Sequence, residues 1–131
     1  MKRVVLALVL AALSDSAAAA WVRVGGNNNL GCYADPTSIR RTGSMVKMRS
    51  LLDFKTPQTD QSIGGKPYLS QKDQREYDCK NERYHLLYFS LRSGQMDAGK
   101  IVHSDPDPGE WSPVVPGSIG EALWKFACGK K

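Results

Sequence analysis

The sequence has few of the residues that catalysis and metal binding use most, with two histidines and three cysteines among 131 residues. Cys32, Cys79 and Cys128 form no C-x-x-C pair, and with only His85 and His103 beside them they leave few ligands for a zinc site. A hydrolase needs a nucleophile with an oriented base, and two isolated histidines do not supply that pair. We therefore expect a protein that is not an enzyme, has no metal site and needs no cofactor.

Long apolar runs are also scarce. The run over residues 4–13 (VVLALVLAAL) follows the positive residues Lys2 and Arg3 and precedes an Ala-x-Ala sequence that ends at Ala20. A membrane span needs about 20 apolar residues, and this run is about half as long, so the pattern predicts a cleaved signal peptide over residues 1–20. The sequence then predicts one exported domain over residues 21–131.

Acidic residues are outnumbered, because 18 Lys and Arg stand against 13 Asp and Glu and give a formal net charge of +5. This balance favours anionic partners such as acidic polysaccharide, and a soluble surface away from its isoelectric point is the alternative explanation. The charge is spread along the chain, so we expect no nucleic-acid partner. The candidate binding cations are Arg40, Arg41, Lys47 and Arg49, which we place on the outer side of one hairpin.

Alternation of apolar and polar residues indicates strands. The segment 44–55 (SMVKMRSLLDFK) has Val46, Met48 and Leu52 on one face and charged residues on the other, as in a half-buried strand. No connection between such segments is long enough for a helical crossover, so antiparallel hairpins are expected. The predicted fold class is α+β, with about six strands in one antiparallel sheet and a C-terminal helix on one face.

The last segment (PGSIGEALWKFACGKK) has the signals of a short helix. Ser118 and Glu121 have the spacing of a capping box, and Gly129 suits the C-terminal stop. Cys128 falls beside the apolar stripe of this helix, so its partner should lie on the sheet. We choose Cys79 over Cys32, because Cys79 shares a strand face with Tyr77 whereas Cys32 sits between a glycine-rich loop and a proline turn. Cys32 would then be free or would pair between chains.

The segment 83–92 is apolar on both faces. Tyr84, Leu86 and Tyr88 are expected on one face, opposite Leu87 and its partners on the other. One face should form core under the helix. The other is either covered by the apolar loop 111–115 (WSPVV) or exposed, in which case it marks an interaction surface, and exposed strand edges would also allow a homodimer.

A resemblance to a known family extends over nearly all of residues 21–131. The stretches YADPTSIRRTG, SLLDFKT, EYDC, LLYFS, SDPDPGEW and GEALWKFAC, in this order and spacing, resemble the surface-adhesin protein E family of exported bacterial domains. The resemblance implies a six-stranded antiparallel sheet whose concave face carries a helix tethered by a disulfide. The tethering cysteines match Cys79 and Cys128, in agreement with the choice above. The family name implies adhesion to host matrix components.

Two functions follow from these observations. The leading hypothesis is an exported, non-enzymatic binding domain that adheres to host extracellular-matrix proteins, acidic polysaccharide or the cell envelope. The alternative is a periplasmic module that binds a small apolar ligand or cofactor in the concavity of the sheet. The alternative would use His103, which ends a short edge strand, and the face that carries Tyr84 and Tyr88. His85 is interpreted as a partly covered sheet residue.

Overall fold

A computed structural model describes residues 20–131, so all but one residue of the predicted signal peptide lies outside the described part. Seven strands form one antiparallel sheet in which neighbours in the chain are neighbours in space, in the order β1-β2-β3-β4-β5-β6, with β7 paired to β5. The elements are β1 (Val22–Gly26), β2 (Leu30–Thr42), β3 (Met45–Gln58), the short 3₁₀ helix η2 (Gln61–Ile63), β4 (Tyr68–Asp78), β5 (Arg83–Arg92), β6 (Ile101–Asp105), β7 (Ser112–Pro113) and the helix α2 (Ile119–Cys128). The predicted α+β architecture is confirmed.

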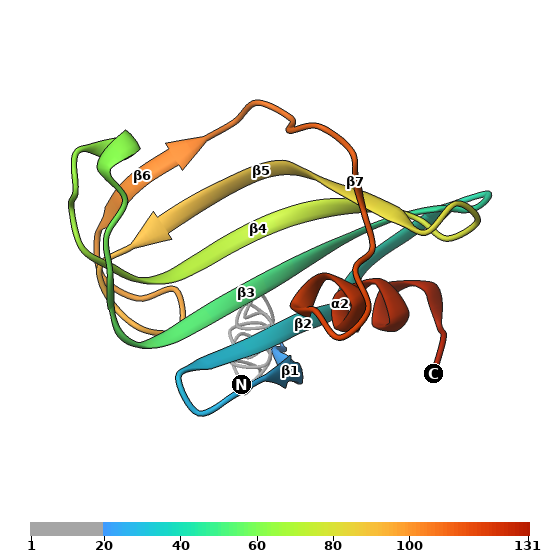
Figure 1. The fold of residues 1–131 in the computed structure, drawn as a ribbon, viewed down its shortest axis with the longest axis horizontal. Helices are drawn as coiled ribbons and strands as arrows, with labels where there is room; N and C mark the ends of the chain where they lie inside the picture. The colour runs from blue at the N-terminus through green and yellow to red at the C-terminus, as the bar shows by residue number, and fades with distance from the viewer. Residues whose placement is uncertain (1–19) are drawn as a thin grey trace, which may run out of the picture.

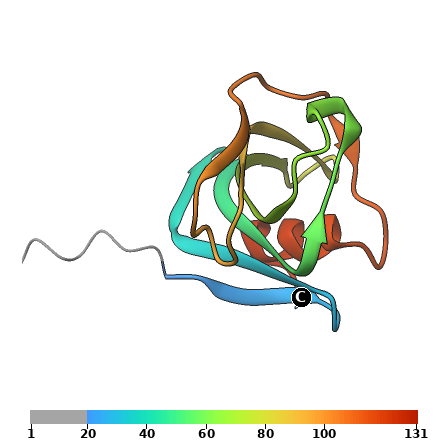
Figure 2. The ribbon, with the colours of Figure 1, turned by 90° about the vertical axis from the view of Figure 1, so that its left-hand side faces the viewer.

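The sheet is strongly curved, and α2 lies on its concave side (Figures 1 and 2). Each strand pair except the two-residue pairing of β7 carries a register shift. The two largest are equal: four residues of β2 between Asp35 and Arg40 stand against Met48 alone on β3, and four residues of β3 between Asp53 and Gln58 stand against Leu69 alone on β4. Such bulges bend and twist a strand locally, which is how a meander of long strands wraps around one short helix. We call the face toward α2 the inner face and the opposite one the outer face.

The helix begins and ends as its sequence predicts. The Ser118 hydroxyl accepts the backbone N–H of Glu121 at 3.1 Å, while the Glu121 carboxylate accepts the N–H of Gly117 at 3.0 Å. Gly129 adopts the left-handed conformation (φ 68°) that stops the helix. The disulfide Cys79–Cys128 ties its last turn to the residue after β4. The predicted pairing is therefore confirmed, and Cys32 is a free thiol buried in the core.

The core lies between α2 and the inner faces of β2, β3 and β4. Its fully buried members include Met48, Tyr77 and Leu123, and the indole N–H of Trp124 donates to the Asp78 carbonyl at 3.0 Å. Gly120 lets the helix lie close to the sheet, since a Cβ there would stand 2.9 Å from the Tyr84 ring. A small apolar core of this kind explains why the chain anchors its only long described helix covalently.

A buried ion pair continues the inner face beyond the apolar core. Asp73 is fully buried and accepts from Nε and Nη2 of Arg75 at 3.3 and 3.2 Å, from Gln71 at 2.9 Å and from the Ser50 hydroxyl. Arg75 in turn lies over the Tyr84 ring, 5.4 Å from its centroid. Every carboxylate oxygen thus has a donor, which is the condition for burying such a charge.

Two connections shape the outer surface. The β5–β6 loop (93–100) crosses the outer face, where the Met96 N–H donates to Asp53 at 2.6 Å and Asp97 pairs with Lys72 at 3.0 Å. The proline-rich segment after β6 forms the short strand β7, which pairs only along the edge of β5. None of the helices within residues 20–131 has the length and apolar character needed to cross a membrane.

Candidate functional site

The register brings three of the four predicted cations together at the hairpin end of the outer face. Arg40 pairs with Lys47 across β2 and β3, and Arg49 follows two residues along β3 on the same face. Arg41 pairs with Val46, a buried inner-face residue, so the prediction that all four cations share one side is wrong for Arg41. Strand alternation separates adjacent residues of β2, and Arg40 and Arg41 therefore point to opposite faces.

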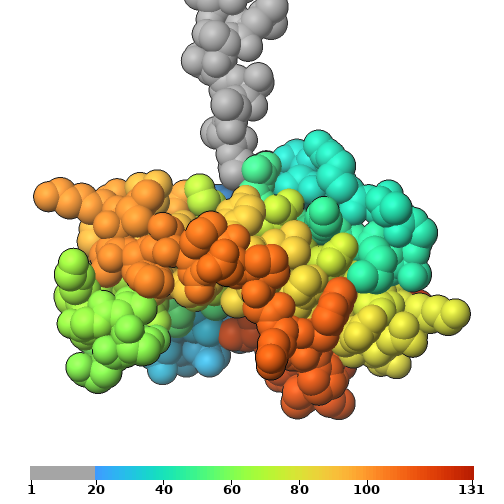
Figure 3. Space-filling view, turned by 90° about the horizontal axis from the view of Figure 1, so that it is seen from above, coloured from blue at the N-terminus to red at the C-terminus, as the bar shows by residue number. Residues whose placement is uncertain are grey.

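The rows of the sheet extend this cluster across β4 to β5. Lys47 pairs with Glu76, which pairs with His85. In the next row, Arg49 pairs with Gln74, which pairs with Tyr88. Neighbouring strands lie about 4.8 Å apart, so both rows are continuous surface. Figure 3 shows the two hairpin ends side by side, with β2–β3 in teal and β4–β5 in yellow. We call this surface the outer basic face, formed by Arg40, Lys47, Arg49, Arg83, His85, Tyr88 and Trp111.

Two guanidinium groups on this face are held from beneath by buried carboxylates. Arg49 Nη2 lies 3.4 Å from Asp35, with the arginine side chain 45% exposed and the aspartate 1%. Arg83 Nε lies 3.0 Å from Asp78, with exposures of 43% and 4%. The negative charges are therefore covered while the positive groups face solvent. Each arginine is thus anchored through one nitrogen while much of its side chain stays exposed to solvent.

The Asp78 carboxylate also organises the β4–β5 turn. Hydrogen bonds from the side chain and backbone of Asn81, from Arg83 and from the Lys80 N–H lower its pKa to about 2. The carboxylate is therefore ionised throughout the physiological range and holds Arg83 in place at every relevant pH.

An aromatic corner completes the face, and the sequence reasoning did not find it. The Trp111 ring stacks on His85, with 4.0 Å between ring centroids, and the Arg83 guanidinium lies 4.4 Å from the Trp111 centroid. His85 is fixed by Glu76 at 2.9 Å through Nε2 and by the Gly109 carbonyl at 3.1 Å through Nδ1. A hollow of about 290 Å³ opens beside the indole, lined partly by Asn81. The only signal in the sequence was an aromatic residue in a proline-rich loop.

Tyr84 and Tyr88 do not share a face, which corrects the prediction. Tyr84 pairs with the core residue Tyr77, whereas Tyr88 pairs with Gln74 on the outer face. The register shift in β5 places Leu87 as an extra residue opposite the Gln74–Arg75 step, so alternation is inverted beyond it. Tyr84 packs under α2, and Tyr88 is 37% exposed beside the cation rows. The loop 111–115 reaches both faces, with Val114 packed on the inner core and Trp111 stacked on His85 at the outer face.

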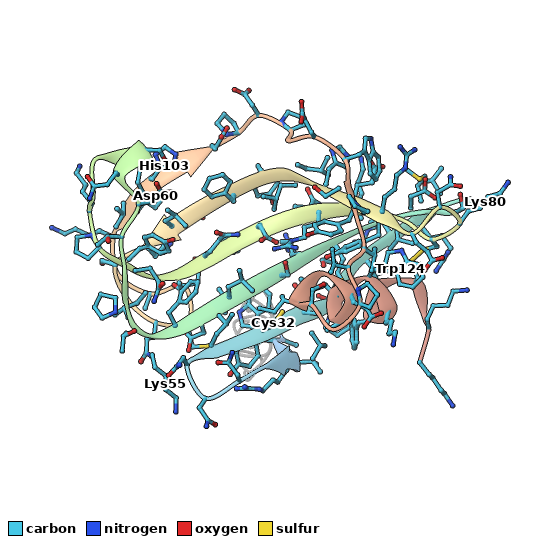
Figure 4. The ribbon with its side chains drawn as sticks, viewed as in Figure 1. Cys32, Lys55, Asp60, Lys80, His103 and Trp124 are labelled. Carbon is cyan, nitrogen blue, oxygen red and sulfur yellow. A yellow bond between two sulfur atoms is a disulfide. The ribbon has the colours of Figure 1, made fainter. Side chains whose placement is uncertain are left out.

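His103 lies at the other end of the sheet. It pairs with Leu91 across β5 and β6, and its ring centroid is 5.8 Å from that of Phe89. Figure 4 shows it near Asp60, at the N-terminus of η2. The structure therefore separates His103 from both tyrosines that the small-ligand hypothesis grouped with it. Within residues 20–131, no three His, Cys, Asp or Glu side chains are placed to hold a metal ion.

The comparisons with known proteins agree with this architecture. Residues 21–129 match the profile of the family described as surface-adhesin protein E. The chain belongs to the surface-adhesin protein E family. This family assignment describes an adhesin-like bacterial surface protein and points away from an enzyme.

Solved structures of Haemophilus influenzae protein E show the same fold as this family member. Its crystal form II is 12% identical, with a TM-score of 0.64 over 83% of this chain and 87% of that chain. Protein E from non-typeable Haemophilus influenzae is also 12% identical, with a TM-score of 0.60 over 83% of this chain and 75% of that chain. A comparison with curated protein sequences gave no significant match.

Proposed function

We propose that this protein is an adhesin that binds acidic components of the host extracellular matrix through its outer basic face. The family supports an adhesin-like role. The outer basic face supports the site, because it combines fixed cations with exposed aromatic surface, and both are enriched at protein interaction sites. We place the exported protein at the outside of the cell, where the matrix is accessible.

The observation that carries this proposal is the pair of exposed guanidiniums seated on buried carboxylates, Arg49 on Asp35 and Arg83 on Asp78. Sulfates and carboxylates of acidic polysaccharides accept two parallel hydrogen bonds from a guanidinium. Arg83 already lies against Trp111, so a planar sugar face or an aromatic side chain of a partner can stack beside it. Binding should be strong at low salt and weaken as the ionic strength rises, since exposed charges are screened.

Heparin serves as the acidic polysaccharide probe. The test variant combines Arg40→Glu with Lys47→Glu, because both side chains are exposed and neither pairs with a buried carboxylate. The control combines Lys55→Glu with Lys66→Glu, which changes the net charge equally at sites outside the outer basic face. We expect the test variant to bind about tenfold more weakly than the control, as each exposed charge contributes up to about 1 kcal/mol. Equal weakening in both variants would reduce the effect to net charge and would contradict the proposed site.

A second test concerns location. Antibody labelling or protease shaving of intact cells should detect the protein as strongly as in lysed cells if it is surface-exposed. Labelling only after lysis would refute the adhesin proposal and would direct the search to partners within the cell envelope. The same test and control variants can be measured for binding to immobilised host matrix proteins in place of heparin.

A further inference from the structure

The edge strand β1 leaves its outer backbone open. Among the described residues, β1 is the first strand of the sheet and pairs only with β2. The N–H and C=O groups on its far side have no backbone partner within residues 20–131. An exposed row of such groups is a template on which another extended chain can pair.

A groove accompanies this open edge, between β1 and α2. It has a volume of about 650 Å³, and its floor includes Val24, Ile119 and Phe126. Its rim carries three cations, Arg23, Lys125 and Lys130. We call this site the β1–α2 groove.

Positive charges outnumber negative ones in the β1–α2 groove. Glu121 is its one carboxylate, and this group already accepts from the Gly117 N–H at 3.0 Å and lies 3.9 Å from Lys125. The Arg23 guanidinium lies 5.9 Å from the Tyr33 ring centroid and donates to the Asn27 carbonyl at 3.2 Å, so it is held at the rim. The groove is therefore suited to an occupant with carboxylate side chains.

The two glycines of β1 meet neighbours within this chain. Gly25 lets α2 sit close, since a Cβ there would stand 3.2 Å from that of Ala122. Gly26 has a φ of 118°, which ends the strand at the turn. The strand thus carries only three side chains, Val22, Arg23 and Val24, along its five residues.

We propose that an extended, acidic segment of a partner protein adds to β1 as a further antiparallel or parallel strand, with carboxylates directed to Lys125 and Lys130. Main-chain hydrogen bonds would supply affinity and the groove would select side chains, as in other cases of strand addition. This site lies on the edge beside α2, whereas the outer basic face lies on the opposite side of the sheet at the β2–β3 and β4–β5 hairpins. The two sites can therefore act independently.

The probe is a fluorescent peptide that alternates Glu with Thr, which favours extended structure and carries its carboxylates on one side. Two matched peptides serve as controls: one with Lys in place of Glu, and one with N-methylated backbone at alternate residues and the charge kept. We expect the Glu peptide to bind at low salt, the Lys peptide to show no binding, and the N-methylated peptide to bind at least tenfold more weakly. Equal binding of the N-methylated peptide would overturn strand addition and leave simple charge attraction.

Protein variants locate the site. Lys125→Glu with Lys130→Glu should weaken binding of the Glu peptide at least tenfold, whereas Lys66→Glu with Lys100→Glu, which makes the same charge change away from the groove, should leave it within twofold. Hydrogen exchange provides a readout that does not depend on any variant: peptide binding should slow exchange of amides over residues 22–26. Absence of slowing there would overturn the proposal.

A second copy of this chain is the competing occupant. Sedimentation over a range of protein concentrations distinguishes it. A monomer with exposed β1 amides supports a partner segment, whereas a dimer whose β1 amides are protected without peptide would overturn the proposal in favour of self-association.

Discussion

Removing the disulfide between Cys79 and Cys128 should cost a large share of the stability of this domain. The bridge closes a loop with a sequence separation of 49 residues. Chain entropy for a loop of this length gives a stabilisation of about 4 kcal/mol at 25 °C, acting mainly by restricting the unfolded chain. The total free energy of unfolding of a domain of this size is roughly 5–15 kcal/mol. The bridge therefore accounts for a quarter or more of it.

The helix has other contacts that should keep the reduced protein folded. Leu123, Trp124 and Ala127 are buried against the sheet, and the Trp124 N–H donates to the Asp78 carbonyl. A ten-residue helix is marginal alone, so these contacts and the bridge act together. We expect the reduced protein to have native secondary structure with lower stability.

The assay is urea unfolding of a Cys79→Ala, Cys128→Ala variant, followed by tryptophan fluorescence. Both the variant and its parent should carry Cys32→Ala, which prevents thiol exchange with the bridge in the unfolded state. With a slope of about 1.5 kcal/mol/M, a loss of about 4 kcal/mol lowers the midpoint by roughly 2–3 M.

Hydrogen exchange tests the reasoning behind this number. Because the bridge acts on the unfolded chain, its removal lowers the free energy of global opening, so in the variant the slowest amides of β3 and β4 should exchange faster by the same factor as those of α2. A midpoint shift below about 0.5 M, or faster exchange confined to α2, would refute the loop-closure explanation and indicate only local fraying.

Three further predictions test the packing and the buried groups. Gly120→Ala should destabilise by about 1–3 kcal/mol in thermal unfolding despite better helix propensity, because its Cβ would meet the Tyr84 ring at 2.9 Å; a gain in stability would contradict this packing. Burial raises the pKa of the Cys32 thiol from 9.0 to about 12. Above pH 9 the folded state therefore keeps the thiol proton that the unfolded state loses, so the stability contributed by this group is complete below pH 9 and falls as pH rises toward 12. Between pH 9 and 10, Cys32→Ala should flatten the fall of the unfolding free energy with pH. An unchanged slope would exclude the Cys32 thiol as a cause of that fall. The lowered pKa of Asp78 acts in the opposite direction, because the stability contributed by its carboxylate is complete above pH 4 and is lost as pH falls toward 2. Asp78→Asn should therefore lower the stability of the protein at neutral pH and make that stability less dependent on pH between 4 and 2.

The strands, the helix and its tether were open to prediction because each depends on local signals. The alternation around Val46 and Met48 fixes the buried face of β3, and the Ser118–Glu121 spacing fixes the start of α2. The disulfide could be chosen because few cysteines are present and the resemblance to surface-adhesin protein E favoured the same pair. The signal peptide stays a prediction, since it lies almost wholly outside the described residues.

The candidate site was only partly predictable. Arg40, Lys47 and Arg49 are close in sequence, so one hairpin brings them together. Trp111 comes to Arg83 and His85 through a loop that returns to β5 after β6, and no periodicity describes such a contact. The wrong grouping of Tyr84 with Tyr88 has a specific cause, because one extra residue in β5 inverts every later side chain.

By itself, the sequence determined the class of fold, the capped and tethered C-terminal helix and the basic character of the chain, because periodicity, capping and composition act over a few residues or over the whole chain. Only the tertiary structure decided which cations share a face, which carboxylates hold them, and where an open strand edge meets a groove. Those outcomes depend on strand register, bulges and loop return, where a shift of one residue moves a side chain to the other side of the sheet.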